Sequence, residues 1–135
     1  MELTQEQKDW LDKCTKPEGW MFIETDAKGV GVWKFNWETG LIDVYGDFDC
    51  SNQNLKDFKG VRFGVISQNF DCRDNELTSL EGAPQEVGWT FDCENNNLTS
   101  LEGAPQVVKG HFICDYNQLT SLVGAPQKVG AYFDC

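Results

Sequence analysis

A repeat of 21 residues is the feature of this 135-residue chain that most limits how it can fold. Its clearest marker is a phenylalanine followed two residues later by a cysteine. Successive cysteines of this kind lie 22, 21, 21 and 21 residues apart, at Cys50, Cys72, Cys93, Cys114 and Cys135. The most complete copies read V-x-x-x-F-x-C-x-x-N-x-L-x-x-L-x-G-A-P-Q. A fixed period over most of a chain is typical of a solenoid, in which each coil buries its apolar side chains against the next.

The order of residues within one unit predicts a short strand followed by turns. Phenylalanine and cysteine alternate with period two, so both point inward from the strand. The asparagine three residues after the cysteine (Asn75, Asn96 or Asn117) can bond backbone groups that a turn leaves unpaired. The Ala-Pro step that ends the unit disfavours a helix. We therefore expect stacked coils with parallel strands about 4.8 Å apart and an extended or turn-like convex side.

One copy aligns with a known repeat signature, L-x-x-L-x-L-x-x-N-x-L, at Val87, Phe91, Cys93, Asn96, Leu98 and Leu101. By these residues the chain resembles the leucine-rich repeat, although phenylalanine and cysteine replace two leucines. The F-D-C-x-x-N-x-L-T-S-L-E-G-A-P cadence is similar to short repeat proteins of tailed bacteriophages and some bacteria. The resemblance covers residues 41–135. It implies an α/β fold, a leucine-rich-repeat solenoid of about four and a half repeats with a parallel β-sheet on its concave face.

Residues 1–40 carry no repeat, and we expect them to form a separate N-terminal cap of one helix and a β-hairpin. Thr4 and Gln7 fit a capping box for a helix over Gln5 to Cys14. The apolar face of that helix would hold Trp10, Leu11 and Cys14. Strands are expected at 20–23, 30–35 and 41–44, with turns at 26–29 and 38–40.

Tryptophans are dense in this segment, at Trp20, Trp33 and Trp37. They fit either the packing of a cap or a Trp-rich binding surface. We favour the cap, because aromatic clusters are usually core and the first coil of a solenoid needs a cover.

The cysteines predict a column of small, reduced, buried side chains rather than a chemical site. In-register side chains on neighbouring coils point in parallel, which argues against disulfides, and no C-x₂₋₄-C pair supports a zinc site. Cys14 would lie in the helix core, and Cys135 would be partly exposed. We expect no metal, cofactor or catalytic residue. The weakest alternative is an enzyme that uses His111, the one histidine, with a carboxylate.

The outward positions of the repeat predict an acidic face. The chain has 22 Asp and Glu against 11 Lys and Arg, a net charge of −11. A central column on the concave face would consist of Asp49, Asp71, Asp92, Ile113 and Asp134. The full set of candidate partner-binding residues is Asp47, Asp49, Asp71, Arg73, Asp92, Glu94, His111, Ile113, Asp115, Tyr132 and Asp134. Like charges on adjacent coils repel one another, and a basic partner would relieve that repulsion.

These features predict a protein–protein interaction module that binds a basic protein and neither nucleic acid nor a membrane. The resemblance implies a cytoplasmic protein, in the host cytoplasm if it is phage-encoded. There it would inhibit a host defence or nucleic-acid-processing enzyme, for instance as a DNA mimic. The alternative is a calcium-dependent adhesion or structural repeat protein. An uncovered strand at Phe133 also predicts a homodimer through the C-terminal strand edge.

Overall fold

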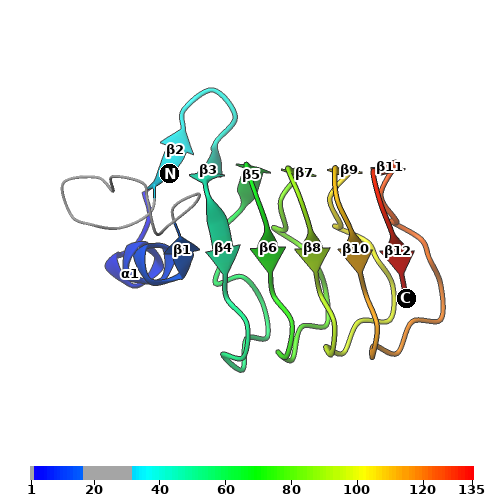
Figure 1. Cartoon of the computed structure of the whole chain (residues 1–135). Coiled ribbons are helices and arrows are strands. Elements are labelled where there is room, and N and C mark those ends of the chain that lie inside the picture. Colours follow the sequence, from blue (N-terminus) through cyan, green and yellow to red (C-terminus); the bar gives the residue numbers. More distant parts are fainter. Residues whose placement is uncertain (1, 17–31) are drawn as a thin grey trace.

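The computed structural model describes residues 2–16 and 32–135, which form a β-solenoid of about four turns with one short helix at one end (Figure 1). Two sheets run along the solenoid. The order of the first sheet is β1 (Thr15–Lys16), β4 (Asp47–Asp49), β6 (Phe70–Asp71), β8 (Phe91–Asp92), β10 (Phe112–Ile113) and β12 (Phe133–Asp134). The order of the second is β11 (Lys128–Val129), β9 (Val107–Val108), β7 (Glu86–Val87), β5 (Phe63–Ile66), β3 (Leu41–Tyr45) and β2 (Val32–Asn36). We number the coils 1 to 5, from β3–β4 to β11–β12.

The phenylalanine column confirms the predicted register of the repeat. Strands β4, β6, β8, β10 and β12 pair in parallel, with each phenylalanine opposite the next. The rings stack with centroids between 5.1 and 5.5 Å apart. Those of coils 1 to 4 are fully buried, as are their cysteines except for a 1 % exposure of Cys114. Phenylalanine and cysteine therefore both point inward, as period two predicts.

The second sheet was not predicted. The sequence pattern places one strand in each unit, but Val87 and its equivalents lie in a second strand, which has two residues in coils 3 to 5. A corner separates the two strands, and at this corner the Gly88 N–H donates to the Ile66 carbonyl over 2.8 Å. The α/β assignment is wrong for the repeats, since among the described residues the only helix is α1 (Gln5–Cys14).

The repeat asparagines bond neighbouring coils to one another, as expected. Asn96 is 3 % exposed, and its Nδ2 donates to the carbonyls of Cys72 and Cys93 at 3.0 and 3.1 Å. Its Oδ1 accepts the Leu77 N–H at 3.0 Å. Asn75 makes equivalent bonds one coil earlier. Each asparagine thus satisfies buried backbone groups of its own coil and of the previous one.

The step from coil 1 to coil 2 is one residue longer than the later steps, and a β-bulge in β5 absorbs the extra residue. The register between β3 and β5 shifts between the pairs Ile42–Phe63 and Val44–Ile66. At the bulge, Asp43 Oδ1 accepts the Val65 N–H at 2.9 Å. The 22-residue spacing of the first two cysteines therefore marks a local irregularity in an otherwise constant stack.

Helix α1 begins with the predicted capping box, in which Thr4 and Gln7 bond each other's backbone N–H groups. It packs against coil 1: the Trp10 ring lies edge-on to Phe48 at 5.2 Å, and its Nε1 donates to Gln53 Oε1 over 2.9 Å. Gln53 replaces the repeat asparagine in this coil, so the departure from the motif coincides with a contact to the helix.

Strands β2 and β3 pair antiparallel around a turn near Gly40, where the sequence predicted strands at 30–35 and 41–44. Because β3 also belongs to coil 1, the hairpin spans the predicted boundary between residues 40 and 41. Trp33 donates to Asp12 over 2.8 Å, whereas Trp37 is 82 % exposed. The expected strand at 20–23, the turn at 26–29 and Trp20 lie outside the described residues.

The cysteines follow the prediction in four cases and depart from it in one pair. Cys14, Cys50, Cys72 and Cys93 are free and buried. Cys114 and Cys135 instead form a disulfide, with their Cα atoms 4.6 Å apart. That separation lies within the range that disulfides require, so parallel stacking of the side chains does not forbid the bond. The expectation of a wholly reduced column is therefore wrong at coils 4 and 5.

Candidate protein-binding face

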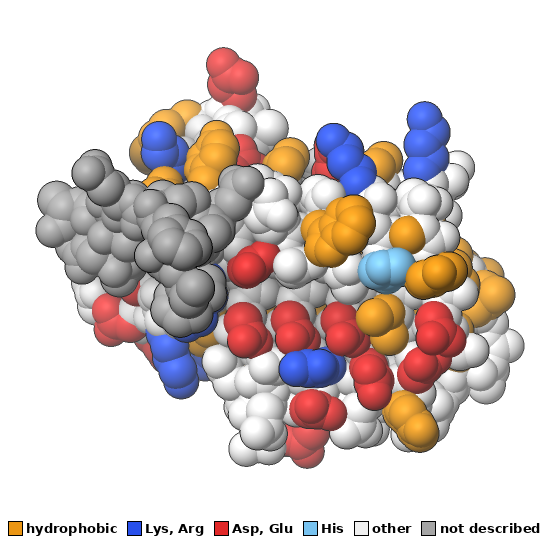
Figure 2. Space-filling view, in the orientation of Figure 1, with side chains coloured by type: hydrophobic (Ala, Val, Ile, Leu, Met, Phe, Trp, Pro, Cys, Tyr) orange, Lys and Arg blue, Asp and Glu red, His pale blue; other side chains and the backbone are white. Residues whose placement is uncertain are grey.

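The outward side of the first sheet carries most of the predicted site residues. We call it the β4–β12 face. Figure 2 shows a row of acidic side chains across this face, with the histidine and several hydrophobic side chains beside it. With a second sheet in the fold, this face is one of two sheet surfaces on the solenoid.

The acidic column consists of Asp49, Asp71 and Asp92, which are direct partners in the pairing of β4, β6 and β8. Each carboxylate is fixed by the turn that follows it, because its Oδ1 accepts the backbone N–H two residues ahead. These bonds measure 3.0, 3.1 and 3.0 Å. Three negative charges are therefore held side by side at the strand spacing of about 4.8 Å.

Burial makes two of these carboxylates resist ionisation. The pKa of Asp71 is raised to about 6, chiefly by desolvation, and the charges of Asp92 and Asp49 raise it further. The Arg73 N–H and guanidinium oppose that shift. The pKa of Asp92 is also raised, again mainly by desolvation. The column is therefore an electrostatically unfavourable arrangement in the unbound protein.

Arg73, Glu94 and Asp115 form what we call the lower flank of the face. Each lies two residues after the column position of its own coil. Arg73 Nε lies 3.4 Å from Asp71 Oδ2, and half of the arginine side chain is exposed. Glu94 and Asp115 occupy the equivalent positions of coils 3 and 4, and the pKa of each is raised, first by desolvation. Arg73 is the one basic residue among the eleven predicted site residues, so it offsets only part of the negative charge.

Asp47 has a structural role on the upper side of the column. Its Oδ1 accepts the Asn69 N–H at 2.8 Å, and Asn69 Oδ1 in turn accepts the Thr90 N–H at 2.9 Å. His111 repeats this arrangement, because its Nδ1 accepts the Tyr132 N–H at 3.2 Å. In coils 1, 2 and 4 the residue before the phenylalanine thus links its coil to the next.

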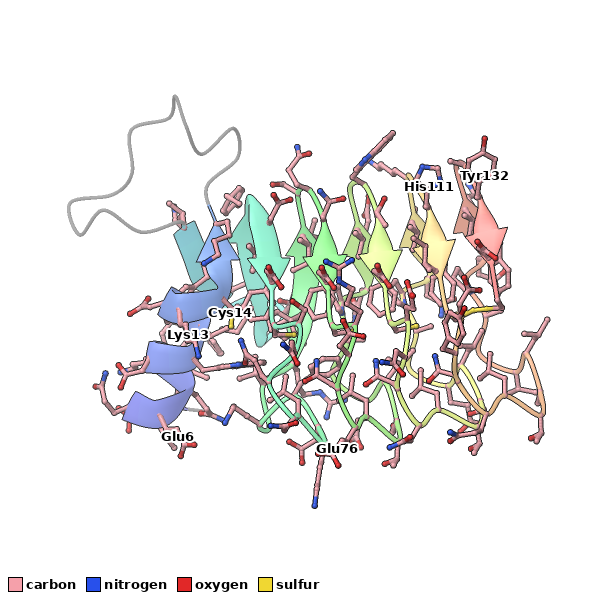
Figure 3. The ribbon with its side chains drawn as sticks, turned by 60° about the horizontal axis from the view of Figure 1, so that its bottom comes forward. Glu6, Lys13, Cys14, Glu76, His111 and Tyr132 are labelled. Carbon is pink, nitrogen blue, oxygen red and sulfur yellow. A yellow bond between two sulfur atoms is a disulfide. The ribbon has the colours of Figure 1, made fainter. Side chains whose placement is uncertain are left out.

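The acidic column ends at Asp92, because coil 4 carries Ile113 at the same position of the unit. Beside the column, at earlier positions of the unit, coils 3 to 5 carry a row of aromatic side chains. We define this aromatic row as Trp89, His111 and Tyr132. The Trp89 and His111 rings meet edge-on at 5.9 Å, and the His111 and Tyr132 rings stack at 4.8 Å (Figure 3). Trp89 is 49 % exposed and Tyr132 is 73 % exposed. The face therefore has an acidic half and an aromatic half.

All eleven predicted residues lie on the β4–β12 face or its lower flank, but they do not form one cluster. Asp134 is separated from the acidic column by Ile113, since Ile113 pairs with Asp92 on one side and Asp134 on the other. Sequence analysis missed Trp89. A large apolar residue at an outward corner, where other units carry Gly, Gln or Ala, was the signal that could have revealed it.

The hydrogen bond of His111 and the spacing of potential metal ligands bear on the chemistry that the described residues offer. His111 Nδ1 is already bonded to the Tyr132 N–H. Within residues 2–16 and 32–135, no three His, Cys, Asp or Glu side chains gather closely enough to bind a metal ion. Among the helices that the structure describes, none has the length and apolar character needed to span a bilayer.

Comparisons with protein-family models, with curated proteins and with solved structures gave no match to this chain. The resemblance to leucine-rich repeats therefore stays a prediction from the repeat pattern.

Proposed function

We propose that the chain is a protein-binding module whose β4–β12 face binds a basic protein surface. The observation that carries this proposal is the in-register column of Asp49, Asp71 and Asp92. Adjacent like charges are destabilising, and burial has raised the pKa of Asp71 to about 6. A cationic partner would stabilise the ionised column and would be steered toward it by the net charge of −11.

The two halves of the face have different roles in this proposal. Carboxylates that remain partly hydrated mainly speed and orient association. Exposed aromatic side chains become desolvated on binding and mainly lengthen the lifetime of the complex, as Tyr and Trp do at interface hot spots. Trp89 and Tyr132 are the candidates for that second role.

A narrower form of the proposal is a phage-encoded inhibitor that occupies the nucleic-acid site of a host defence or nucleic-acid-processing enzyme. Its support is the acidic charge together with the resemblance of the repeats to bacteriophage proteins. It predicts that duplex DNA and this chain compete for the same partner. A partner that binds both at once would exclude the DNA-mimic form and leave the wider proposal standing.

The first experiment finds the partner and the face together. A photo-crosslinking amino acid replaces Tyr132 in one variant and Val65, an exposed residue of β5 on the other sheet, in a second. The proposal expects a basic protein to crosslink at position 132 and not at position 65. Equal crosslinking at both positions, or crosslinking at 65 alone, would contradict it.

The second experiment measures association with the identified partner at low and high salt. Asp71→Asn with Asp92→Asn removes two charges but keeps oxygen acceptors for the backbone bonds of the turns. Glu81→Gln with Glu102→Gln removes the same charge from exposed positions outside the β4–β12 face. We expect about tenfold slower association for the first pair at low salt and less than twofold for the second. Equal slowing would mean that net charge, rather than this face, attracts the partner.

A further inference from the structure

Coil 4 departs from the repeat at three outward positions of the β4–β12 face. Ile113 stands where the other four coils carry Asp, and Tyr116 stands where coils 1 to 3 carry Asn or Asp. His111 precedes the phenylalanine, at a position that is Asp, Asn or Thr in coils 1 to 3. We call His111, Ile113 and Tyr116 the coil 4 stripe, because they follow one another along a single coil and cross the direction of the acidic column.

The backbone at Tyr116 has a conformation that tyrosine rarely adopts. Its φ is 54°, in the left-handed region, and the equivalent residues Asn52, Asp74 and Asn95 have φ between 54° and 56°. Asparagine and aspartate tolerate this region because their short polar side chains bond locally, whereas a bulky side chain is strained there. Asn95 makes such a bond, since its Nδ2 donates to Asp74 Oδ1 over 2.9 Å. The turn therefore favours Asn at position 116, where the sequence has Tyr.

Packing does not explain the tyrosine either, because its side chain is 77 % exposed. That exposure belongs to the position in the unit. Asp74 and Asn95 hold the same position on coils that have neighbours on both sides, and they are exposed as well. Ile113, on β10 between β8 and β12, is only half-buried. A strained and exposed aromatic side chain that suits neither the turn nor the core indicates a role in binding.

Carboxylates lie beside the stripe on coil 3. Asp92 pairs with Ile113 in the sheet, and its Oδ1 accepts the Glu94 N–H at 3.0 Å, which fixes the carboxylate on the face. Desolvation, and then the charges of Asp92 and Asp115, raise the pKa of Glu94, so these three carboxylates act on one another. Figure 2 shows hydrophobic and acidic side chains next to each other on this half of the face. The stripe is therefore an apolar strip with negative charge along its side.

An arginine side chain has the chemistry that such a strip accepts. Its aliphatic stem can cover Ile113, and its planar guanidinium can stack on an aromatic ring while its N–H groups bond carboxylates. Tyr116 offers a ring at one end of the stripe, and Trp89, edge-on to His111, offers one at the other. The lysine ammonium is compact and strongly hydrated, so it gains from the carboxylates but little from the rings.

We propose that the coil 4 stripe selects arginine, so that the basic partner binds through an arginine-containing segment seated on Ile113 and Tyr116 beside Asp92. This inference rests on the proposed function and narrows it, since the acidic column alone attracts any cation. It also adds Tyr116 to the binding residues, a position that the repeat pattern did not mark.

The first test measures stability and needs no ligand. Tyr116→Asn restores the residue of coils 1 and 3 and relieves the left-handed backbone, so we expect a higher midpoint of thermal unfolding. Asn95→Tyr, the reverse exchange one coil earlier, should lower the midpoint. A lower midpoint for Tyr116→Asn would show that the tyrosine stabilises the fold, and it would overturn the inference that its role is binding.

The second test measures selectivity with defined probes. Two fluorescent peptides alternate glycine with either arginine or lysine and carry equal charge, and fluorescence anisotropy at low salt gives their dissociation constants. We expect the parent to bind the arginine peptide about two- to fivefold more tightly, and Tyr116→Asn to bind both peptides alike. Tyr45→Asn, the matched control, removes an exposed tyrosine from β3 on the other sheet and should keep the preference.

A third variant separates the stripe from charge. Ile113→Asp adds a carboxylate at the column position, so attraction by charge alone would tighten the binding of both peptides equally. We expect the arginine preference to fall instead. Equal binding of the two peptides by the parent, or no binding of either, would overturn the proposal, and so would a preference that survives both Tyr116→Asn and Ile113→Asp. Failure of the proposed function is detected separately, in the crosslinking experiment, which uses no peptide.

Discussion

The triplet Phe-Asp-Cys occurs in coil 3 and in coil 5, and its residues lie in very different surroundings in the two places. In coil 3, Phe91 and Cys93 have no exposed surface. In coil 5, Phe133 is 41 % exposed and Cys135 is exposed as well. Coil 3 is covered by coils on both sides, whereas β12 of coil 5 pairs with β10 at the edge of the sheet. Burial in a solenoid thus depends on the neighbouring coils and not on the sequence of one unit.

The largest effect should come from removing the same side chain in the two coils. Phe91→Ala deletes a ring that stacks between Phe70 and Phe112, and we expect it to lower the free energy of unfolding by about 3–5 kcal/mol. Phe133→Ala should cost less than about 1.5 kcal/mol, because its ring is already partly hydrated. Urea unfolding measures both. Equal losses would mean that coil 5 is as tightly packed as coil 3.

The asparagine column offers a second, smaller test. Asn96→Ala removes the only side-chain acceptor of the buried Leu77 N–H and one of the two amide donors of each of the Cys72 and Cys93 carbonyls, and we expect a loss of about 2–3 kcal/mol. Asn117 makes the equivalent bonds but is only half-buried, so Asn117→Ala should cost about half as much. Thermal and urea unfolding would check the difference. Asn97→Ala, at an exposed position, serves as the control and should change stability by less than about 0.5 kcal/mol.

A pH series tests the acidic column of coils 1 to 3. The folded-state pKa of Asp71 is about 6, above its unfolded value near 3.8, so the folded protein holds the proton more tightly. Ionised Asp71 therefore lowers the free energy of unfolding at high pH. This destabilising effect fades as the pH falls through 6 toward 4 and the carboxylate becomes protonated in the folded state. We expect Asp71→Asn to flatten the change in unfolding free energy between pH 5 and pH 7 by about 1 kcal/mol. An unchanged slope in chemical denaturation would show that Asp71 is fully ionised in the folded state.

The smallest effect is expected for a surface ion pair that joins coils 3 and 4. Lys109 Nζ lies 3.3 Å from Glu86 Oε1, and the lysine side chain is 63 % exposed. Glu86→Gln should lower stability by less than about 0.5 kcal/mol, with the difference disappearing in high salt. A loss comparable to that of Asn96→Ala would mean that the second sheet depends on surface charge more than on its buried valines.

The parts of the fold that could be predicted are those that repeat. Phe91, Cys93 and Asn96 recur at fixed spacing, and alternation alone gives their inward direction. The continuation of the second sheet through coils 3 to 5 escaped prediction because its strands there, such as Glu86–Val87, are two residues long and too short to show a period of two. The disulfide escaped it because spacing shows that Cys114 and Cys135 are neighbours but not whether their sulfurs meet.

The candidate site could be predicted only where it follows the repeat. The acidic column belongs to one position of the unit, so Asp49, Asp71 and Asp92 were placed together correctly. Trp89 lies one position away from the column that His111 and Tyr132 share. Its contact with His111 depends on the bend of the corner, which no period encodes.

The bulge between coils 1 and 2 has a consequence for how such a chain can change over generations. From coil 2 onward, paired residues on neighbouring coils are one whole unit of 21 residues apart. Duplication or loss of 21 residues would therefore preserve each pairing and make the solenoid one coil longer or shorter. The single 22-residue unit needs Asp43 to receive a displaced N–H and Gly64 to leave room beside it. Within these strands, an insertion that is not a whole unit leaves a backbone group out of step with the stack, and here Asp43 bonds that group.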